Sequence, residues 1–175
     1  MRRVLVVAMS GAGKTTAARR IAAQHALPFH EMDVLAIGPG WSTRSGFVPE
    51  VERIVATDAW VFDSWGYPEV REQLWARADT VVWLDYPRRV VLPRLLRRSL
   101  RRSWSRAPVF GGNRERWRDW LSTGHPFWHA VTTFDERRHL LARRTAVRPH
   151  LRTHRFRSPG ELEEWLSGPG SGSDG

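Results

Sequence analysis

The segment that most constrains the fold is residues 8–16, Ala-Met-Ser-Gly-Ala-Gly-Lys-Thr-Thr, which follows the apolar run Val4–Val7. A β-branched run, a glycine-containing turn and a helix, in that order, direct backbone N–H groups at an anion. The pattern G-x-x-x-x-G-K-[ST] is typical of phosphate-binding loops, and Ala8 replaces its first glycine. Because Ala8 falls at the strand end, while Gly11 and Gly13 remain for the tight turn, we expect an intact loop with Ala8 at most crowding its entrance.

Lysine usage supports the same interpretation. The chain has 28 basic residues, and Lys14 is its only lysine. A compact ammonium fits a loop wrapped around a phosphate, whereas the wide planar fork of arginine does not. An ordinary lysine at a helix start is the alternative, but chance would place the only lysine here about once in 28.

Length and composition exclude several classes of protein. A chain of 175 residues is expected to form one domain with a sizeable core, here residues 1–167, followed by a disordered tail at 168–175. No apolar stretch is long enough to span a membrane, and the short run after Met1 ends in the glycine loop, unlike a signal peptide. The absence of cysteine excludes disulfides and cysteine-based metal sites, and we expect a cytoplasmic protein.

The net charge of +10 is concentrated in one segment. Between Arg88 and Arg118 there are eleven arginines and one acidic residue, Glu115. A solvated charged helix normally interleaves acidic residues, so this segment is expected to hold a phosphate or to bind nucleic acid.

Apolar runs alternate with helical segments along the chain. Strands are expected at 4–8, 28–33, 59–63, 80–85 and 150–156, and helices at 14–25, 49–57, 69–77, 87–103, 128–144 and 159–166. This alternation predicts an α/β fold with a parallel sheet covered on both faces. The carboxyl ends of parallel strands meet at one edge, so Asp33, Asp63 and Asp85 are expected to converge near the loop.

The chain resembles the adenylate-kinase-like branch of P-loop kinases, in particular the small bacterial DNA topology modulation, or FlaR-like, proteins. The matching segments cover roughly residues 2–166 in the family's order: 8–16, Met32-Asp33, Pro39-Gly40-Trp41, Trp60–Asp63, Ala78–Pro87, the arginine-rich helix and Gly112–Glu115. The departures are Ala8 and Ser64-Trp65, where the group usually continues Asp-Gly-Asn. The resemblance implies a P-loop NTPase fold with a five-stranded parallel sheet and a mobile arginine-bearing lid at about 103–126.

A mechanism can be assigned to these residues as a hypothesis, with ATP and Mg²⁺ as cofactors. Asp33 is expected to face the phosphoryl acceptor, where it would accept the proton of the acceptor hydroxyl or hydrogen-bond that hydroxyl. Glu31 could assist at the metal. Asp85 is a weaker metal candidate, with a structural cap as the alternative. The nucleotide-binding residues expected in the loop are Ser10, Gly11, Ala12, Gly13, Lys14, Thr15 and Thr16, with Lys14 bridging the β- and γ-phosphates, Thr15 ligating Mg²⁺, and Asp63 holding Mg²⁺ through water.

Arginines 94, 97, 98, 101 and 102 recur at helical spacing. The resemblance implies that one or two of them close on the transferring phosphoryl group. Arg98 and Arg102 are the candidates for that role, and Arg97 and Arg101 for contacts with the nucleotide; the spacing alone leaves the choice open. Trp60, Trp83 and Trp165 are expected in the core. The other tryptophans that flank the basic segment could stack on nucleobases: Trp104, Trp117, Trp120 and Trp128.

These features favour an ATP-dependent kinase that acts on a small molecule, with a nucleotide or nucleoside as one candidate substrate. One alternative is a nucleic-acid-binding protein with a regulatory or vestigial ATP site, using Arg88–Arg118; another is a toxin-type kinase. The segment between Asp33 and Trp65 should line the acceptor pocket, with Trp41, Arg44 and Trp65 suited to an aromatic or anionic ligand.

Overall fold

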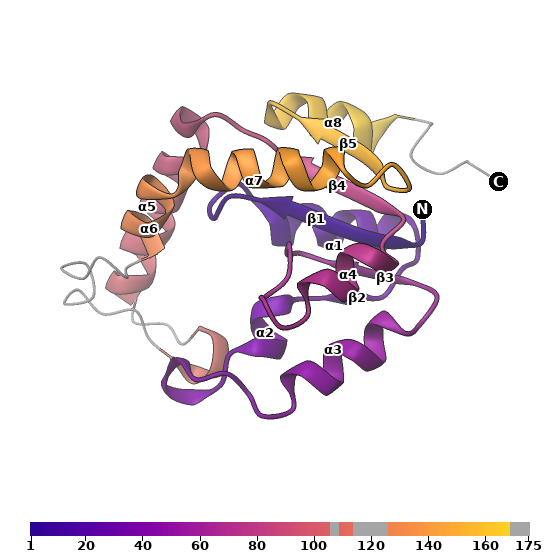
Figure 1. The fold of residues 1–175 in the computed structure, drawn as a ribbon. Helices are drawn as coiled ribbons and strands as arrows, with labels where there is room; N and C mark the ends of the chain where they lie inside the picture. The colour runs from indigo at the N-terminus through magenta and orange to yellow at the C-terminus, as the bar shows by residue number, and fades with distance from the viewer. Residues whose placement is uncertain (106–108, 114–125, 169–175) are drawn as a thin grey trace.

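The computed structural model describes residues 1–105, 109–113 and 126–168 (Figure 1). Its five strands form one parallel sheet, as predicted, and the structure shows their order within it, β2-β3-β1-β4-β5. The strands are β1 (Arg3–Ala8), β2 (Phe29–His30), β3 (Trp60–Phe62), β4 (Thr80–Leu84) and β5 (Arg152–Phe156). The helices are α1 (Lys14–Gln24), α2 (Met32–Ala36), α3 (Phe47–Val55), α4 (Arg71–Arg77), α5 (Arg88–Ser105), α6 (Pro126–Thr132), α7 (Phe134–Ala146) and α8 (Pro159–Ser167), with 3-10 turns η1 (Pro39–Trp41) and η2 (Phe110–Gly112).

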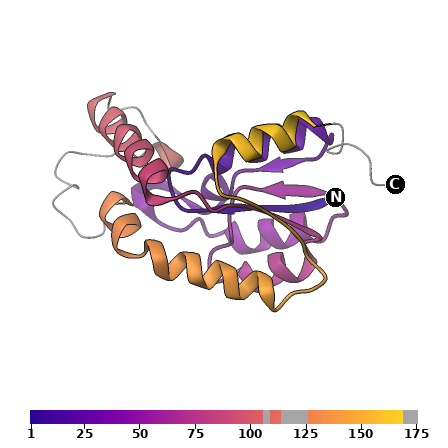
Figure 2. The same cartoon turned by 90° about the horizontal axis from the view of Figure 1, so that it is seen from above.

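Both faces of the sheet are covered, because consecutive β1 side chains alternate between two apolar clusters. Val4 and Val6 pack with residues of α1 and α8. Leu5 and Val7 pack with residues of α3, α4 and α7 on the opposite face. In Figure 2 the two sets of helices lie on either side of the sheet, and α5 stands at one end of it. Trp60 and Trp83 are buried in this core, as predicted, and Trp165 is partly buried against it.

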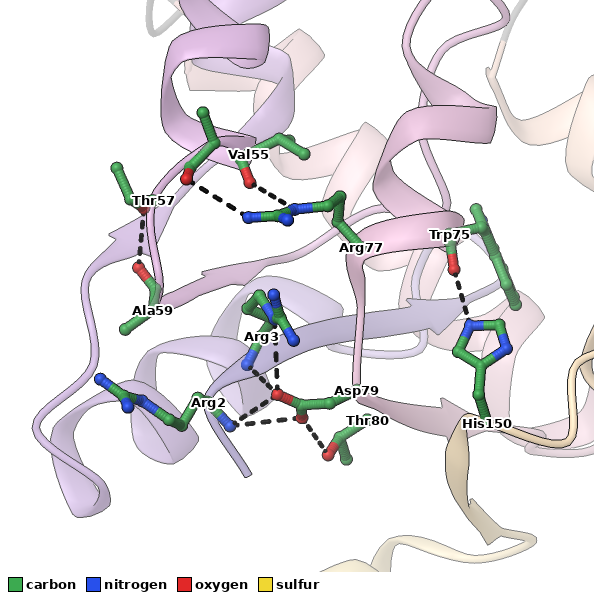
Figure 3. Close-up of polar contacts among 11 residues, drawn as sticks. Arg2, Arg3, Val55, Thr57, Ala59, Trp75, Arg77, Asp79, Thr80 and His150 are labelled. Carbon is green, nitrogen blue, oxygen red and sulfur yellow. Dashed lines mark hydrogen bonds and ion pairs between the residues drawn. The ribbon is translucent and has the colours of Figure 1, made fainter.

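The amino-terminal edge of the sheet is closed by polar contacts within the chain (Figure 3). Asp79, just before β4, accepts hydrogen bonds from the backbone N–H groups of Arg2 and Arg3 and from the Thr80 hydroxyl. His150 lies 3.4 Å from the carbonyl of Trp75 at the same edge. The Asp79 contacts hold the start of β1, the strand whose carboxyl end leads into the loop at 8–16.

The second strand is shorter than expected. It ends at His30, and α2 begins at Met32, so Asp33 lies in the first turn of a helix rather than at a strand end. The cause is tertiary: the Asp63 carboxylate, which follows β3, accepts a 3.0 Å hydrogen bond from the Met32 N–H. A carboxylate at the first N–H groups stabilises a helix start.

Other boundaries also shift. The long helix expected at 128–144 is two helices, α6 and α7, separated at Thr133, whose backbone leaves helical geometry (φ −99°, ψ 9°). Helix α3 starts at Phe47, two residues before the expected Pro49. Most of the expected lid lies outside the described residues, at 106–108 and 114–125, as does the tail from 169. Within the described part of the chain, no helix has the length and apolar character needed to cross a membrane.

Candidate active site

The phosphate loop lies at the carboxyl end of β1 and leads directly into α1. Ala8 is the last residue of β1 and pairs with Leu84, an extended position that accommodates its methyl group. Gly13 precedes α1 with φ 96°, and no side chain caps this helix. Among the described residues, no acceptor pairs with the amides of Lys14, Thr15 and Thr16, the orphan donors of a helix start. These donors suit a bound phosphate.

Two glycines shape the loop for different reasons. Gly11 has φ 90°, and a Cβ there would lie 2.8 Å from Leu95 Cβ, so the loop packs directly against α5. Gly13 also has positive φ, but a Cβ there would meet nothing within 4 Å. The first glycine therefore permits close packing of loop on helix, and the second leaves open space where a ligand can approach the backbone.

Lys14 points back over the loop. Its ammonium donates hydrogen bonds to the carbonyls of Ala8 (3.3 Å) and Met9 (3.4 Å). The pKa of Lys14 is lowered to about 8, chiefly by desolvation; Asp33 and Asp63 oppose the shift, and the nearby Arg98 and Arg137 add to it. A bound phosphate would place a negative charge beside this ammonium and so stabilise its charged form.

Thr15 and Asp63 lie together, as the metal hypothesis requires. The Thr15 hydroxyl donates a 2.5 Å hydrogen bond to one Asp63 oxygen, and the other oxygen accepts the Met32 N–H. Asp63 is 7% exposed. The described residues contain no cluster of three or more His, Cys, Asp or Glu side chains suited to a metal. A hydroxyl and one carboxylate nevertheless fit Mg²⁺, which keeps several waters and takes its remaining ligands from phosphates.

Two adjacent cavities meet at this site. The loop cavity, of about 330 Å³, is lined by Gly13, Thr15 and Thr16 and by Arg94, Arg98 and Arg102 of α5. The inner cavity, of about 390 Å³, is lined by Trp65 and Tyr67 from the segment after β3, by Arg71 of α4 and by Arg137 of α7. Four residues line both cavities: Ser10, Lys14, Asp33 and Asp63.

The arginines of α5 separate into two groups. Arg94, Arg98 and Arg102 recur every four residues and face the loop cavity. Arg101 lines a third, more open cavity with Glu31, Val34 and Phe110. Arg97 is exposed and lines none of these three cavities, so the structure does not bring it to the expected nucleotide site. Arg94 lines the loop cavity instead, because residues four apart on a helix, here Arg94, Arg98 and Arg102, lie on the same face.

The inner cavity holds two arginines that sequence reasoning missed. The Arg71 guanidinium lies 4.3 Å from the centre of the Trp65 ring, and that of Arg137 lies 5.6 Å from it. Desolvation lowers the pKa of both guanidiniums, although each keeps its charge. Two desolvated cations on one cavity wall suit a carboxylate or phosphate. Their positions come from α4 and α7, so no local pattern identified them.

Asp85 does not converge with the other two aspartates. Its carboxylate lines neither cavity and instead accepts hydrogen bonds from both Arg138 (2.6 and 2.9 Å) and Arg155 (3.0 and 2.6 Å). The Arg155 guanidinium in turn lies 4.1 Å from the centre of the Trp83 ring. This carboxylate therefore ties the end of β4 to α7 and β5, which is neither the metal role nor the helix cap considered from the sequence.

Three further residues have different surroundings from those expected. Glu31 lines the loop cavity but pairs with Arg19 at 2.8 Å, and it precedes α2 rather than lying in a strand. Arg44 binds the carbonyls of Val34 and Leu35. Neither Arg44 nor Trp41 lines the inner cavity, whereas Trp65 does, as predicted.

Asn113 joins two distant turns of the chain. Its side-chain amide donates to the carbonyls of Gly38 (2.8 Å) and Phe110 (2.7 Å), and its oxygen accepts the Trp41 N–H (3.1 Å). These contacts dock η2, which follows α5, onto η1, which follows α2. They link the arginine-bearing side of the site to the segment that carries Asp33.

Comparison with solved structures identifies the fold. A shikimate kinase from Bacteroides thetaiotaomicron is similar over 94% of this chain and 94% of its own, at 15% identity and a TM-score of 0.52. A sugar kinase from Janibacter sp. HTCC2649 matches over 99% of both chains at 18% identity and a TM-score of 0.46. A gluconokinase from Sinorhizobium meliloti 1021 matches at 23% identity and a TM-score of 0.42 over 55% of this chain and 65% of that chain, just under two thirds of its length.

The first of these likenesses shows that the chain has the α/β fold of a P-loop kinase, with a five-stranded parallel sheet flanked by helices. The sequence matches no protein-family model. A search of curated proteins gives no match either. The narrower resemblance to DNA topology modulation proteins is not confirmed, and nothing in the comparisons supports nucleic-acid binding.

Proposed function

We propose that this protein transfers the γ-phosphoryl group of ATP to a hydroxyl of a small acceptor that also carries a carboxylate or phosphate. The observation that carries the proposal is that the two cavities share Lys14 and Asp33. A phosphate held by the loop and a molecule in the inner cavity therefore meet beside one cation and one carboxylate, the arrangement that phosphoryl transfer needs.

The donor side supplies positioning and charge neutralisation. Amides of Gly11 to Thr15 hold the β-phosphate, and Lys14 bridges the β- and γ-phosphates. Arg98 and Arg102, which line the loop cavity together with the phosphate loop, neutralise charge on the transferring group. Thr15 and Asp63 would hold Mg²⁺, which neutralises phosphate charge when bound.

The acceptor side supplies orientation and a proton acceptor. Arg71 and Arg137 bind the anionic group of the acceptor, which directs its hydroxyl toward Asp33. The hydroxyl oxygen forms a bond to the γ-phosphorus while the bond from that phosphorus to the β–γ bridging oxygen breaks and ADP leaves. The hydroxyl proton passes to Asp33.

The test is ADP release from Mg-ATP against three panels: hydroxylated carboxylates, nucleoside monophosphates, and neutral nucleosides or sugars. We expect turnover with an anionic panel and little with the neutral one. Lys14→Ala should lower turnover at least about 100-fold while the circular dichroism spectrum and melting temperature stay close to those of the wild type. Equal turnover in that variant would refute the proposal.

The absence of ADP release with every panel would also count against a small-molecule kinase. Salt-dependent retention on DNA without ADP release would then favour the nucleic-acid alternative, and transfer of phosphate to a protein would favour the toxin-type alternative.

A further inference from the structure

Tyr67 is held in the wall of the inner cavity by the core behind it. Its ring packs edge-on against Phe47 of α3, with centroids 5.4 Å apart and an interplanar angle of 72°. Its carbonyl accepts hydrogen bonds from the N–H groups of Val70 and Arg71, which fixes the start of α4. Because Phe47 is fully buried, the ring has a rigid support and its hydroxyl a defined position.

The Tyr67 hydroxyl donates a 3.0 Å hydrogen bond to one oxygen of Asp33. Within the described part of the chain, no other side chain hydrogen-bonds the Asp33 carboxylate. Tyr67 and Asp33 both line the inner cavity. One carboxylate oxygen is thus directed toward the tyrosine, which leaves the second for an acceptor hydroxyl.

The charges around Asp33 compete for its carboxylate. The charged side chains that line the two cavities with it are Glu31, Asp63, Lys14, Arg71, Arg94, Arg98, Arg102 and Arg137. Among the cations of this set, Lys14 alone lines both cavities, as Asp33 does, so its ammonium is the group that competes with an acceptor hydroxyl for the Asp33 carboxylate. A direct Asp33–Lys14 ion pair would occupy both the group that accepts the proton and the group that binds the phosphate.

We propose that Tyr67 is a positioning residue that holds the Asp33 carboxylate toward the acceptor and away from Lys14. The inference rests on the proposed function, because it assigns Asp33 the acceptor hydroxyl. It adds a residue that neither the sequence patterns nor the loop motif identified. Tyr67 acts through Asp33 and does not itself exchange a proton in this scheme.

The chain offers a matched control, because it has only two tyrosines. Tyr86 is buried beside β4, packs in the cluster on the other face of the sheet and lines neither cavity. Tyr67→Phe keeps the ring against Phe47 and removes only the hydroxyl. We expect it to lower kcat about tenfold with the KM for ATP within about twofold, whereas Tyr86→Phe should change neither.

A double-mutant cycle with Asp33→Asn separates positioning from a general structural effect. If Tyr67 acts through Asp33, adding Tyr67→Phe to Asp33→Asn should change kcat less than about twofold. Two independent effects would instead multiply, and that result would overturn the proposal. So would an unchanged kcat in Tyr67→Phe alone.

A measurement that does not depend on turnover shows whether this inference fails separately from the proposed function. In a crystal structure of the Tyr67→Phe variant, the Asp33 carboxylate should rotate toward Lys14. An unmoved carboxylate would overturn the positioning role even in an active kinase. A rotated carboxylate in a protein without kinase activity would refute the proposed function and leave the Tyr67–Asp33 contact established.

Discussion

Helices α5 and α7 are both rich in arginine, yet the two helices use that residue differently. On α7, Arg138 pairs with Asp85 and Arg144 with Glu72. Helix α5 contains no acidic residue, and its Arg94, Arg98 and Arg102 face the loop cavity. Arginine content alone therefore does not distinguish an arginine that holds the fold together from one that faces a ligand site.

The difference follows from where each helix lies. Helix α7 runs along the covered face of the sheet, within reach of the acidic residues at the end of β4 and on α4 (Figure 1). Helix α5 stands at the end of the sheet, where Leu95 packs on Gly11 and turns the neighbouring arginines toward the loop. Arg137 is the member of α7 that faces the inner cavity, so each helix supplies cations to one side of the site.

The largest expected effect distinguishes two arginines of α5. Arg98→Ala should lower kcat about 100-fold, because it removes a cation that lines the same cavity as the phosphate loop. Arg89→Ala is the control, since this exposed arginine on the same helix lines neither cavity. Steady-state ADP release measures both variants. Equal losses would mean that α5 acts through its overall charge rather than through the face directed at the loop.

The next largest effect is on stability, and it concerns Asp85, the carboxylate that pairs with Arg138 of α7. Asp85→Ala removes a carboxylate that is 3% exposed and leaves two guanidiniums, 41% and 36% exposed, beside each other. We expect urea denaturation to show a loss of about 2 kcal/mol, less than for a fully buried pair because water reaches the cations. Asp135→Asn weakens the exposed pair with Arg88 and should cost at most about 1 kcal/mol. A smaller loss for Asp85→Ala than for Asp135→Asn would contradict the structural role of Asp85.

The smallest effect is on pH dependence, to which both helices contribute. The pKa of Lys14 is lowered to about 8, chiefly by desolvation and then by Arg98 of α5 and Arg137 of α7. Nucleotide phosphates require the ammonium, so ATP affinity should be nearly constant below pH 8 and fall by up to about tenfold per unit above it. Because the ordinary lysine pKa is higher, the unfolded chain binds more protons between these values, and conformational stability should rise with pH across that range.

Calorimetric titration with ATP in buffers of different ionisation enthalpy measures this proton uptake. Binding above pH 8 should take up a proton, and Arg98→Ala should move the onset to higher pH. Affinity that is constant up to pH 10 would mean that Lys14 keeps an ordinary pKa in the folded protein.

Prediction from the sequence succeeded where the chemistry is local. The strand, glycine turn and helix at 8–16 lie in consecutive residues, so one motif predicted both the element order and the aligned amides. Asp63 was found because the end of a parallel strand adjoins the loop. For Asp33 the neighbourhood was predicted but the element was wrong, since α2 starts at a carboxylate supplied by Asp63 from 31 residues away.

Prediction failed where a residue's role depends on a distant partner. Tyr67, Arg71 and Arg137 converge from separate elements, and no spacing in the sequence relates them. Asp85 has the same position after its strand as Asp63, yet its carboxylate binds Arg138 and Arg155 and lines neither cavity. Arg97 and Arg98 are adjacent in sequence, but only Arg98 has the helical phase that faces the loop.

The sequence by itself determined the alternation of strands and helices, apart from α2 and the division between α6 and α7, and it determined the loop that can hold a phosphate. Hydrophobic periodicity and backbone geometry act between neighbouring residues, which is why these features could be predicted. Only the tertiary structure decided which carboxylates and guanidiniums pair with each other and which line the cavities. The reason is that the Coulomb and hydrogen-bond interactions that sort them depend on separation in space, which residue number does not give.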